Sequence, residues 1–310
     1  LKEVKKAYQY IKCTLKDPKN LTIAIKNWYD FTNLNAYVLK WSIMGDNGKM
    51  LAKGEQSIEV APHATTEVSL GGVRLPRNIR EAYLNLSWTP KKKSAFIGTD
   101  DEVAYDQFVL PANSQYRPTL AKLSEKPEIQ IDPKTGALTS YIYEGQEYLA
   151  SPVRLSLYRP ATDNDNREKK GGAKVWRKLG LNHLVQCVLS VKTSGHTTYS
   201  EVKLLNDKNE TIGSATFEYT IRKDGILSVQ TRFVPDTTFV SSLARVGLVF
   251  EMPHSFNRVT YLGRGEHETY ADRKLSGRIG IYHTDAERMF HYYVRPQATG
   301  NRTDVRWMQV

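Results

Sequence analysis

Residues 37–48 read Tyr-Val-Leu-Lys-Trp-Ser-Ile-Met-Gly-Asp-Asn-Gly, an alternating segment followed by four turn-forming residues. Alternation of apolar and polar side chains with period two is the pattern of a strand with one buried face. Glycine, asparagine and aspartate tolerate the left-handed backbone that a tight hairpin turn requires. This stretch therefore predicts a β-strand that ends in a hairpin turn.

The same pattern recurs on both sides of this stretch, at 20–26, 56–60, 66–70 and 82–88. Short strands at this spacing, with short turns between them, are typical of an immunoglobulin-like β-sandwich. Trp28, Trp41 and Trp88 are expected to supply bulk to its core, with packing favoured over sugar stacking for Trp41 and Trp88.

Alternation lapses between Pro111 and Pro127, where we place a domain boundary. Beyond it, strands are predicted at 128–131, 138–143, 198–205, 214–221, 226–233, 245–252 and 258–262. Residues 173–180 carry apolar side chains at helical spacing and end in Gly180, which predicts a short helix. The whole chain is therefore predicted to be all-β with one or two short helices.

Composition narrows the classes of function. A chain of 310 residues can hold two domains, and a hydrophobic share of 40% is typical of a folded protein. No run of 18 apolar residues occurs, so no membrane partner is expected, and no signal peptide is visible. The net charge of +11 comes from Lys and Arg spread along the chain, which favours a solvated surface over a nucleic-acid partner.

Only two cysteines occur, Cys13 and Cys187. They cannot form a disulfide framework, and no spacing of ligands suggests zinc, so both are expected to be buried free thiols and no metal site is predicted.

Three polar motifs stand out in the second half of the chain. They are Arg159-Pro160-Ala161-Thr162-Asp163-Asn164-Asp165-Asn166, Gly263-Arg264-Gly265-Glu266-His267-Glu268-Thr269-Tyr270-Ala271-Asp272-Arg273, and Pro296-Gln297-Ala298-Thr299-Gly300-Asn301-Arg302-Thr303-Asp304-Val305-Arg306-Trp307. In this order they resemble the small-chain domain of family-2 β-galactosidases. That family has proline and asparagine where this chain has Glu266 and Thr269, and it reads Arg-Ala-Pro where this chain has Arg159-Pro160-Ala161.

The resemblance implies an immunoglobulin-like domain at 1–112, a linker at 113–126 and a supersandwich like that of galactose mutarotases at 127–310. It implies the C-terminal accessory part of a β-galactosidase, short of its final strands, whose barrel is absent here. In the complete enzyme, two barrel glutamates would hydrolyse terminal β-galactosides with retention, magnesium and sodium would serve the pocket, and a homo-oligomer is expected. This fragment alone is expected to be inactive and without a cofactor. A bacterial cytoplasmic or periplasmic location stays open.

The oxygen-rich segment Thr162, Asp163, Asn164, Asp165, Asn166 and Arg167 has three interpretations. Hard cations prefer such oxygen ligands, but the EF-hand spacing is missing. Asp and Asn also cap turns by binding nearby backbone, which we favour on the residues alone. The resemblance adds a third, in which this segment leads into a loop at 166–174, with Gly171-Gly172 as a hinge, at the mouth of the sugar pocket.

No credible catalytic residue is identified. Glycoside hydrolysis needs two carboxylates flanking the bond, and no Asn-Glu-Pro segment or βα alternation occurs. Structural roles are expected for the other motif residues, namely Gly263, Arg264, Gly265, Glu268, Tyr270, Asp272, Arg273, Gly300, Asn301, Arg302 and Trp307.

Two alternatives remain open. One is a stand-alone β-sandwich that binds carbohydrate. The other is mutarotase activity, which needs a histidine facing a carboxylate across a cleft. The candidate residues are His183, His196, His254, His267, His283 and His291, with Glu251, Glu266 and Glu268. Aromatic side chains near the end of the chain are expected to lie in the core; they are Tyr282, Phe290, Tyr292, Tyr293 and Trp307.

Overall fold

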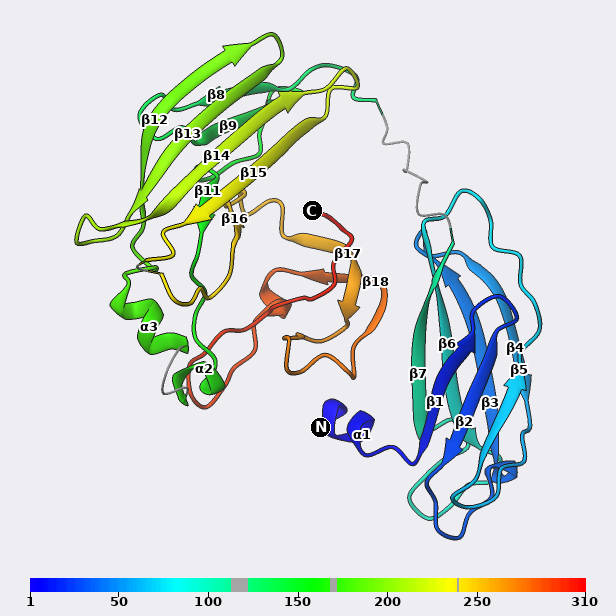
Figure 1. Ribbon diagram of the computed structural model, residues 1–310. Coiled ribbons are helices and arrows are strands. Elements are labelled where there is room, and N and C mark those ends of the chain that lie inside the picture. Colours follow the sequence, from blue (N-terminus) through cyan, green and yellow to red (C-terminus); the bar gives the residue numbers. More distant parts are fainter. Residues whose placement is uncertain (113–121, 168–171, 239) are drawn as a thin grey trace. The chain divides into compact units, whose positions relative to one another are not determined.

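The computed structural model describes residues 1–112, 122–167, 172–238 and 240–310 (Figure 1). The chain divides into two compact units. Unit 1 contains 1–119, 258–290 and 300–310, and unit 2 contains 120–257 and 291–299. Two segments of the predicted second domain thus make their contacts within unit 1. The domain boundaries drawn from the sequence stay a prediction.

Two antiparallel sheets form the sandwich of unit 1. One has the order β1-β2-β5 and the other β4-β3-β6-β7. Their strands are β1 (Ile11–Asp17), β2 (Thr22–Asn27), β3 (Tyr37–Gly45), β4 (Met50–Gln56), β5 (Thr65–Ser69), β6 (Glu81–Pro90) and β7 (Ala104–Pro111). Side chains of alternate residues meet between the sheets, and the core includes Ile23, Ile25, Leu39, Ile43 and Trp88. The predicted alternation therefore fills this core.

A third, smaller sheet completes unit 1. Its order is β18-β17-β19, with β17 (Arg258–Gly265), β18 (Arg278–Asp285) and β19 (Trp307–Gln309). Leu262 and Ile279 of this sheet pack with the buried Tyr83 of β6, next to Met44 and Ile281. The small sheet thus covers part of the outer face of the sandwich. Short helical turns also belong to unit 1: α1 (Lys2–Ala7), η1 (Leu34–Ala36) and η2 (Glu287–Met289).

Unit 2 is built from three antiparallel sheets with the orders β10-β9-β8, β11-β16 and β12-β13-β14-β15 (Figure 1). The strands are β8 (Glu128–Ile131), β9 (Leu138–Tyr143), β10 (Gln146–Glu147), β11 (Arg154–Ser156), β12 (Val185–Ser194), β13 (Thr197–Leu205), β14 (Thr211–Ile221), β15 (Leu227–Pro235) and β16 (Gly247–Val249). Two helices, α2 (Asp163–Arg167) and α3 (Gly172–Lys178), add to it. Its core joins Leu138, Trp176, Val202, Phe217 and Tyr219.

The all-β prediction is confirmed, since antiparallel sheets dominate both units. The helix predicted at 173–180 forms as α3, but two further short helices, α1 and α2, were not predicted. No helix in the described part of the chain is long and apolar enough to cross a bilayer.

The strand prediction at 56–60 is wrong beyond Gln56. Ile58 and Val60 are buried, but the Val60 backbone binds partners outside the strands. Its carbonyl accepts from the Leu34 N–H, and its N–H donates to the Asn33 side chain. Alternating burial here comes from a loop that inserts into the core. The strand predicted at 245–252 shrinks to Gly247–Val249, because its partner β11 has only three residues.

Several aromatic side chains predicted to be in the core are exposed. Trp28 is 51% exposed and lies beneath the Lys12 ammonium. Phe290, Tyr292 and Trp307 are exposed as well. Trp28, Phe290 and Tyr292 all lie outside the strands. Cys13 is a buried free thiol as expected, and Cys187 is a half-buried one.

Candidate functional site

The second and third motifs interlock through Thr269. This side chain is fully buried, and its backbone N–H donates to Asn301 O at 2.9 Å. Its hydroxyl accepts the Thr303 N–H at 2.9 Å, while the Asn301 side chain donates to Thr269 O at 2.7 Å. Because buried polar groups are costly without partners, these bonds fix the two segments against each other.

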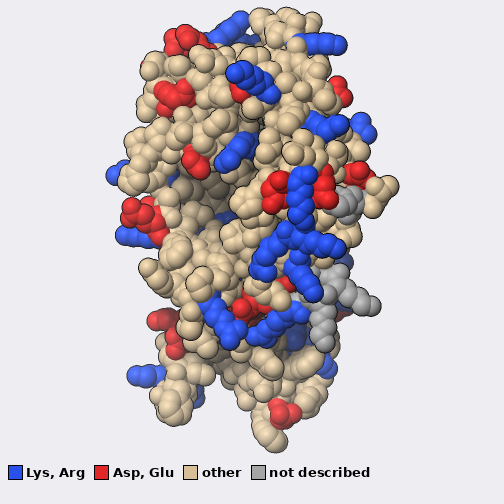
Figure 2. All heavy atoms as spheres, turned by 90° about the vertical axis from the view of Figure 1, so that its left-hand side faces the viewer, with Lys and Arg blue, Asp and Glu red and all other residues tan. Residues whose placement is uncertain are grey.

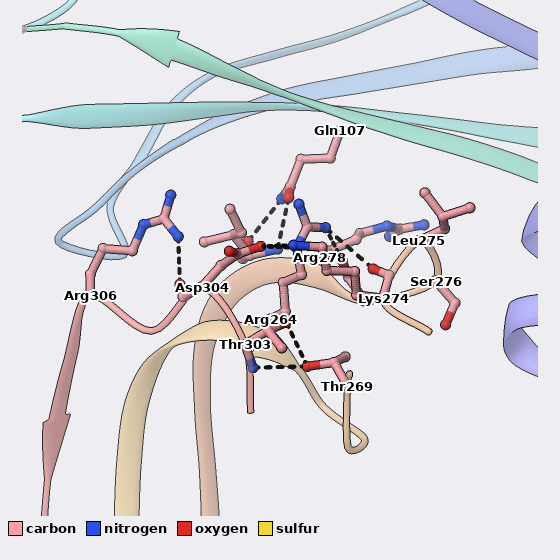
Figure 3. Close-up of polar contacts among 12 residues, drawn as sticks. Gln107, Arg264, Thr269, Lys274, Leu275, Ser276, Arg278, Thr303, Asp304 and Arg306 are labelled. Atoms are coloured by element: carbon pink, nitrogen blue, oxygen red, sulfur yellow. Dashed lines mark hydrogen bonds and ion pairs between the residues drawn. The ribbon is translucent and has the colours of Figure 1, made fainter. Parts of the chain in front are cut away.

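Arg264 on β17 ties the same segments to a nearby turn (Figure 3). Its Nε donates to Asp304 Oδ2 and its Nη1 donates to Gly277 O at 2.8 Å, while its backbone N–H donates to Thr303 O at 3.0 Å. The guanidinium holds the pKa of Asp304 below its ordinary value, although partial burial opposes this. The arginine of the Gly-Arg-Gly motif therefore acts as a structural clamp.

Glu268 and Arg302 form further contacts of the second and third motifs. Glu268 forms an ion pair with Arg273 and accepts the Gly300 N–H at 3.0 Å. Arg302 Nε donates to the phenol of buried Tyr261 at 2.7 Å. We name Arg264, Glu268, Thr269, Arg302 and Asp304, with these partners, the motif cluster.

The remaining motif residues lie at its margins. Tyr270 and Arg273 exchange backbone hydrogen bonds and so form a small bridge beside Asp272. Trp307 pairs with Leu262 in the small sheet and is 39% exposed. A Cβ on Gly265 would lie 2.2 Å from the Tyr261 hydroxyl, so a side chain is excluded there.

Arg306 links the motif cluster to the sandwich of unit 1. Its Nε donates to Glu81 Oε2 at 2.9 Å, and Glu81 also accepts from the Tyr83 hydroxyl at 2.8 Å. Gln107 of β7 adds a second link, because its side chain both donates to Ile279 O and accepts the Ile279 N–H. The motif cluster is thereby attached to β6 and β7.

The two departures from the family pattern have defined partners in this structure. Glu266 forms an ion pair with Lys2 of α1, and Thr269 occupies the centre of the motif cluster. The sequence analysis did not predict that Thr269 is buried, because a threonine within a polar motif does not produce the hydropathy pattern of a buried residue.

The first motif forms a compact turn that its own side chains close. Asp165 accepts the Thr162 N–H at 2.6 Å and the Thr162 hydroxyl at 2.8 Å, and Arg159 Nη1 donates to it at 2.6 Å. Burial alone would raise the pKa of Asp165, but these donors outweigh it and lower the pKa. These hydrogen bonds are the side-chain capping that we favoured from the sequence, and they lie at the start of α2.

The rest of the segment is held from two sides. The Asp163 N–H donates to Gln297 Oε1 at 3.3 Å, and Asn166 Oδ1 accepts from Arg177 of α3 at 2.6 Å. Asn164 is exposed, and exposed Arg167 lies 3.9 Å from the Asp163 carboxylate. Of the predicted loop at 166–174, residues 168–171 lie outside the described part of the chain.

Basic side chains flank this segment. Lys174, Arg177 and Lys178 of α3 are all exposed. Figure 2 shows one face of the molecule, on which Lys and Arg side chains gather in one region beside fewer acidic ones. A negatively charged or hydroxyl-rich molecule approaching α3 would therefore meet hydrogen-bond donors.

Histidine and glutamate side chains line two cavities in unit 1. His283, Glu55 and Glu102 line one of about 1110 Å³, and His267, Glu102 and Glu266 line one of about 310 Å³. There His267 Nε2 lies 2.9 Å from Ser276 Oγ, while Glu266 pairs with Lys2. Burial lowers the pKa of His267, with Lys2 and Arg273 adding to the effect. Both groups thus face partners within the protein rather than each other. Within the described residues, no three or more His, Cys, Asp or Glu side chains gather into a metal site.

Comparison with known proteins gives the family. A model described as "Beta galactosidase small chain" matches residues 124–310, and one described as "Beta-galactosidase, domain 4" matches residues 23–111. The chain belongs to the β-galactosidase family. It carries domain 4 and the small-chain region, as the three motifs indicated.

Individual β-galactosidases are similar to this chain over almost its whole length. A β-galactosidase of Priestia megaterium is 32% identical over 326 residues, which cover 99% of this chain and 31% of the relative. "Beta-galactosidase 2" of Enterobacter cloacae is 27% identical over 99% of this chain and 32% of its own length. This chain therefore spans about a third of these relatives. Among solved structures, the exo-chitosanase CsxA of Amycolatopsis orientalis aligns with 80% of this chain and 27% of its own, at 10% identity and a TM-score of 0.27.

Proposed function

We propose that this chain is the accessory region of a β-galactosidase that hydrolyses terminal β-D-galactosides with retention. The observation that supports this most is the succession of a domain 4 match and a small-chain match along one chain. Glu102 and Glu266 line one cavity, but each forms an ion pair, Glu102 with Arg278 and Glu266 with Lys2. The catalytic carboxylates would therefore belong to a barrel domain of the same protein, about 5 Å apart as retention requires.

Bracing that barrel is the first role we propose. The motif cluster ties three segments distant in sequence, 81–107, 264–277 and 300–306, into unit 1. Such cross-linking gives a rigid support, which a catalytic site needs if its groups are to stay in place. Magnesium and sodium are proposed for the complete enzyme. Homo-oligomer formation by the complete protein is likewise a proposal.

Shaping the mouth of the sugar pocket is the second role we propose, and the segment Thr162–Arg167 would perform it. The Arg159–Asp165 ion pair, with 27% and 16% of the two side chains exposed, fixes the base of this segment, while Arg167 extends into solvent. A segment that is held in place by the Arg159–Asp165 ion pair, and that ends in the exposed Arg167 guanidinium, is suited to contact an aglycone or acceptor.

Replacement of Arg167 tests this role in the complete protein. Arg167→Ala should change the KM for an aryl galactoside, or the share of galactose transferred to an added alcohol rather than to water. The matched control is Arg232→Ala, an exposed arginine of β15. If the two variants have the same kinetic profile as the unaltered enzyme, bracing alone describes this region.

A further inference from the structure

Strand β18 forms one edge of the small sheet in unit 1, because β17 is its only neighbour among the described strands (Figure 1). Successive residues of an antiparallel strand direct their backbone N–H and C=O groups to opposite sides. On β17, the Leu262 C=O and the Arg264 N–H bind the segment 303–306, away from β18. The residues opposite them in β18, Ile281 and Ile279, therefore direct their backbone groups to the free edge.

The first of these edge positions already has a partner that resembles a strand. Gln107 Nε2 donates to Ile279 O at 2.8 Å, and Gln107 Oε1 accepts the Ile279 N–H at 2.7 Å (Figure 3). One residue of a neighbouring antiparallel strand would make the same two hydrogen bonds. The Gln107 amide thus occupies the place of a single residue in an added strand.

The next two edge positions have no such partner. Ile281 and, by the same alternation, His283 direct their backbone groups to the free edge, where no described residue forms a hydrogen bond with them. Ile281 is half-buried and His283 is exposed. An unpaired strand edge of this kind is a template for a further strand. The edge of β18 is therefore open over two successive pairing positions.

The cavity of about 1110 Å³ lies beside this open part of the edge, because residues 280–283 line it. The outer face of the sandwich lines it as well, through Lys40, Ser42, Lys53, Glu55 and Ser87. Two copies paired through β18 would place both sandwiches on the same side of the joined sheet, where this face already lies. The cavity therefore favours a single extended segment over the sheet of a second copy.

The charges that line the cavity favour an acidic segment. Lys40 and Lys53 are exposed, and no described residue forms an ion pair with either ammonium group. Glu102 is already paired with Arg278, so Glu55 is the only lining carboxylate that no described cation pairs with. The net charge of +11 acts in the same direction. Every second side chain of an added strand would point toward the two lysines.

We propose that the edge of β18 binds an extended acidic segment of a partner protein, which joins the small sheet as one further antiparallel strand. The backbone of this segment pairs with Ile281 and His283, and its alternate carboxylates face Lys40 and Lys53. Main-chain hydrogen bonds supply the affinity in this mode of recognition, and the side chains select the sequence.

Hydrogen–deuterium exchange of the complete natural protein, resolved to single amides, tests this edge directly. The probe is the capped hexapeptide Val-Asp-Val-Asp-Val-Asp, and the matched control replaces each aspartate with lysine. We expect the aspartate peptide to slow exchange at Ile281 and His283 about tenfold, and the lysine peptide to have no effect at the same concentration. Exchange at Gly280 and Tyr282 should not change, because their amides already face β17.

Two pairs of variants separate backbone pairing from charge. His283→Pro removes one edge N–H, which proline can do without breaking the ladder to β17, and it should abolish the effect on Ile281. His283→Ala keeps that N–H and should retain the effect. Lys53→Glu, at an exposed position, should reverse the preference between the two peptides. Lys203→Glu makes the same change at an exposed position of β13 and should not.

Three results would overturn the proposal. The first is unchanged exchange with the aspartate peptide, or equal slowing by both peptides. The second is slowing that survives both His283→Pro and Lys53→Glu. The third is slow exchange at Ile281 and His283 before any peptide is added, which would mean that another segment already covers this edge.

Discussion

At the scale of single residues, the motif cluster depends on small polar groups with full sets of partners. Thr269 has no exposed surface, and it exchanges hydrogen bonds with both Asn301 and Thr303. Arg264 and Arg306 each bind a carboxylate and a backbone carbonyl. Such groups stabilise a fold chiefly because leaving any one of them without a partner is costly.

Thr269→Val should therefore destabilise the protein. Valine has a similar shape, but it removes the buried hydroxyl that accepts the part-buried Thr303 N–H, at a cost of about 1–3 kcal/mol. The free energy of unfolding, measured by urea titration, checks this. Thr216→Val, at an exposed position of β14, should change it by less than about 0.5 kcal/mol. Equal stability of the two variants would show that Thr269 is not central to the cluster.

Asp304 should make stability depend on pH. Its pKa in the folded protein lies below the ordinary value of 3.8 because Arg264 donates to it. The ion pair therefore stabilises the fold fully above pH 3.8, and this contribution is lost as the pH falls through the lowered pKa.

Asp304→Asn should accordingly be less stable than the unaltered protein at neutral pH, and this difference should shrink in acid. Thermal unfolding measured from pH 7 downward tests it. Asp100→Asn removes an exposed carboxylate that is not bound to Arg264 and serves as the control. A difference between Asp304→Asn and the unaltered protein that stays constant with pH would contradict the role of the ion pair.

At the scale of elements, most strands could be predicted because one face of each is buried. β3, β6 and β9 begin within one residue of the predicted positions. The failures have a common cause, which is that burial can alternate without strand pairing. At Ile58 and Val60 a loop enters the core, and no local pattern distinguishes that from an edge strand. Helix α2 was missed because its five polar residues carry no apolar period.

Close packing between β17 and its neighbours predicts one sensitive glycine. Gly265→Ala would place a Cβ 2.2 Å from the Tyr261 hydroxyl, which is held by Arg302. Overpacking of this kind costs about 1–3 kcal/mol. Gly247→Ala, in β16, meets no atom within 4 Å and should leave the melting temperature nearly unchanged. If both variants melt alike, β17 has more room than its contacts indicate.

At the scale of the whole molecule, the sequence motifs predicted the family, and the two family models confirm it. The motifs could do so because several polar residues recur in a fixed order, which a hydropathy pattern cannot provide. The packing of 258–290 and 300–310 into unit 1 was beyond such reasoning. It depends on Gln107, Glu81 and Arg306, which lie far apart in the sequence.

We propose that this region supports hydrolysis in the complete protein and does not perform it. The most direct test compares the complete natural protein with this chain alone on an aryl β-D-galactoside, with the anomer of the released sugar followed by NMR. We predict that the complete protein turns over the substrate and releases β-galactose first, while the chain alone shows no turnover. Repeated turnover by the chain alone, or none by the complete protein, would contradict the account.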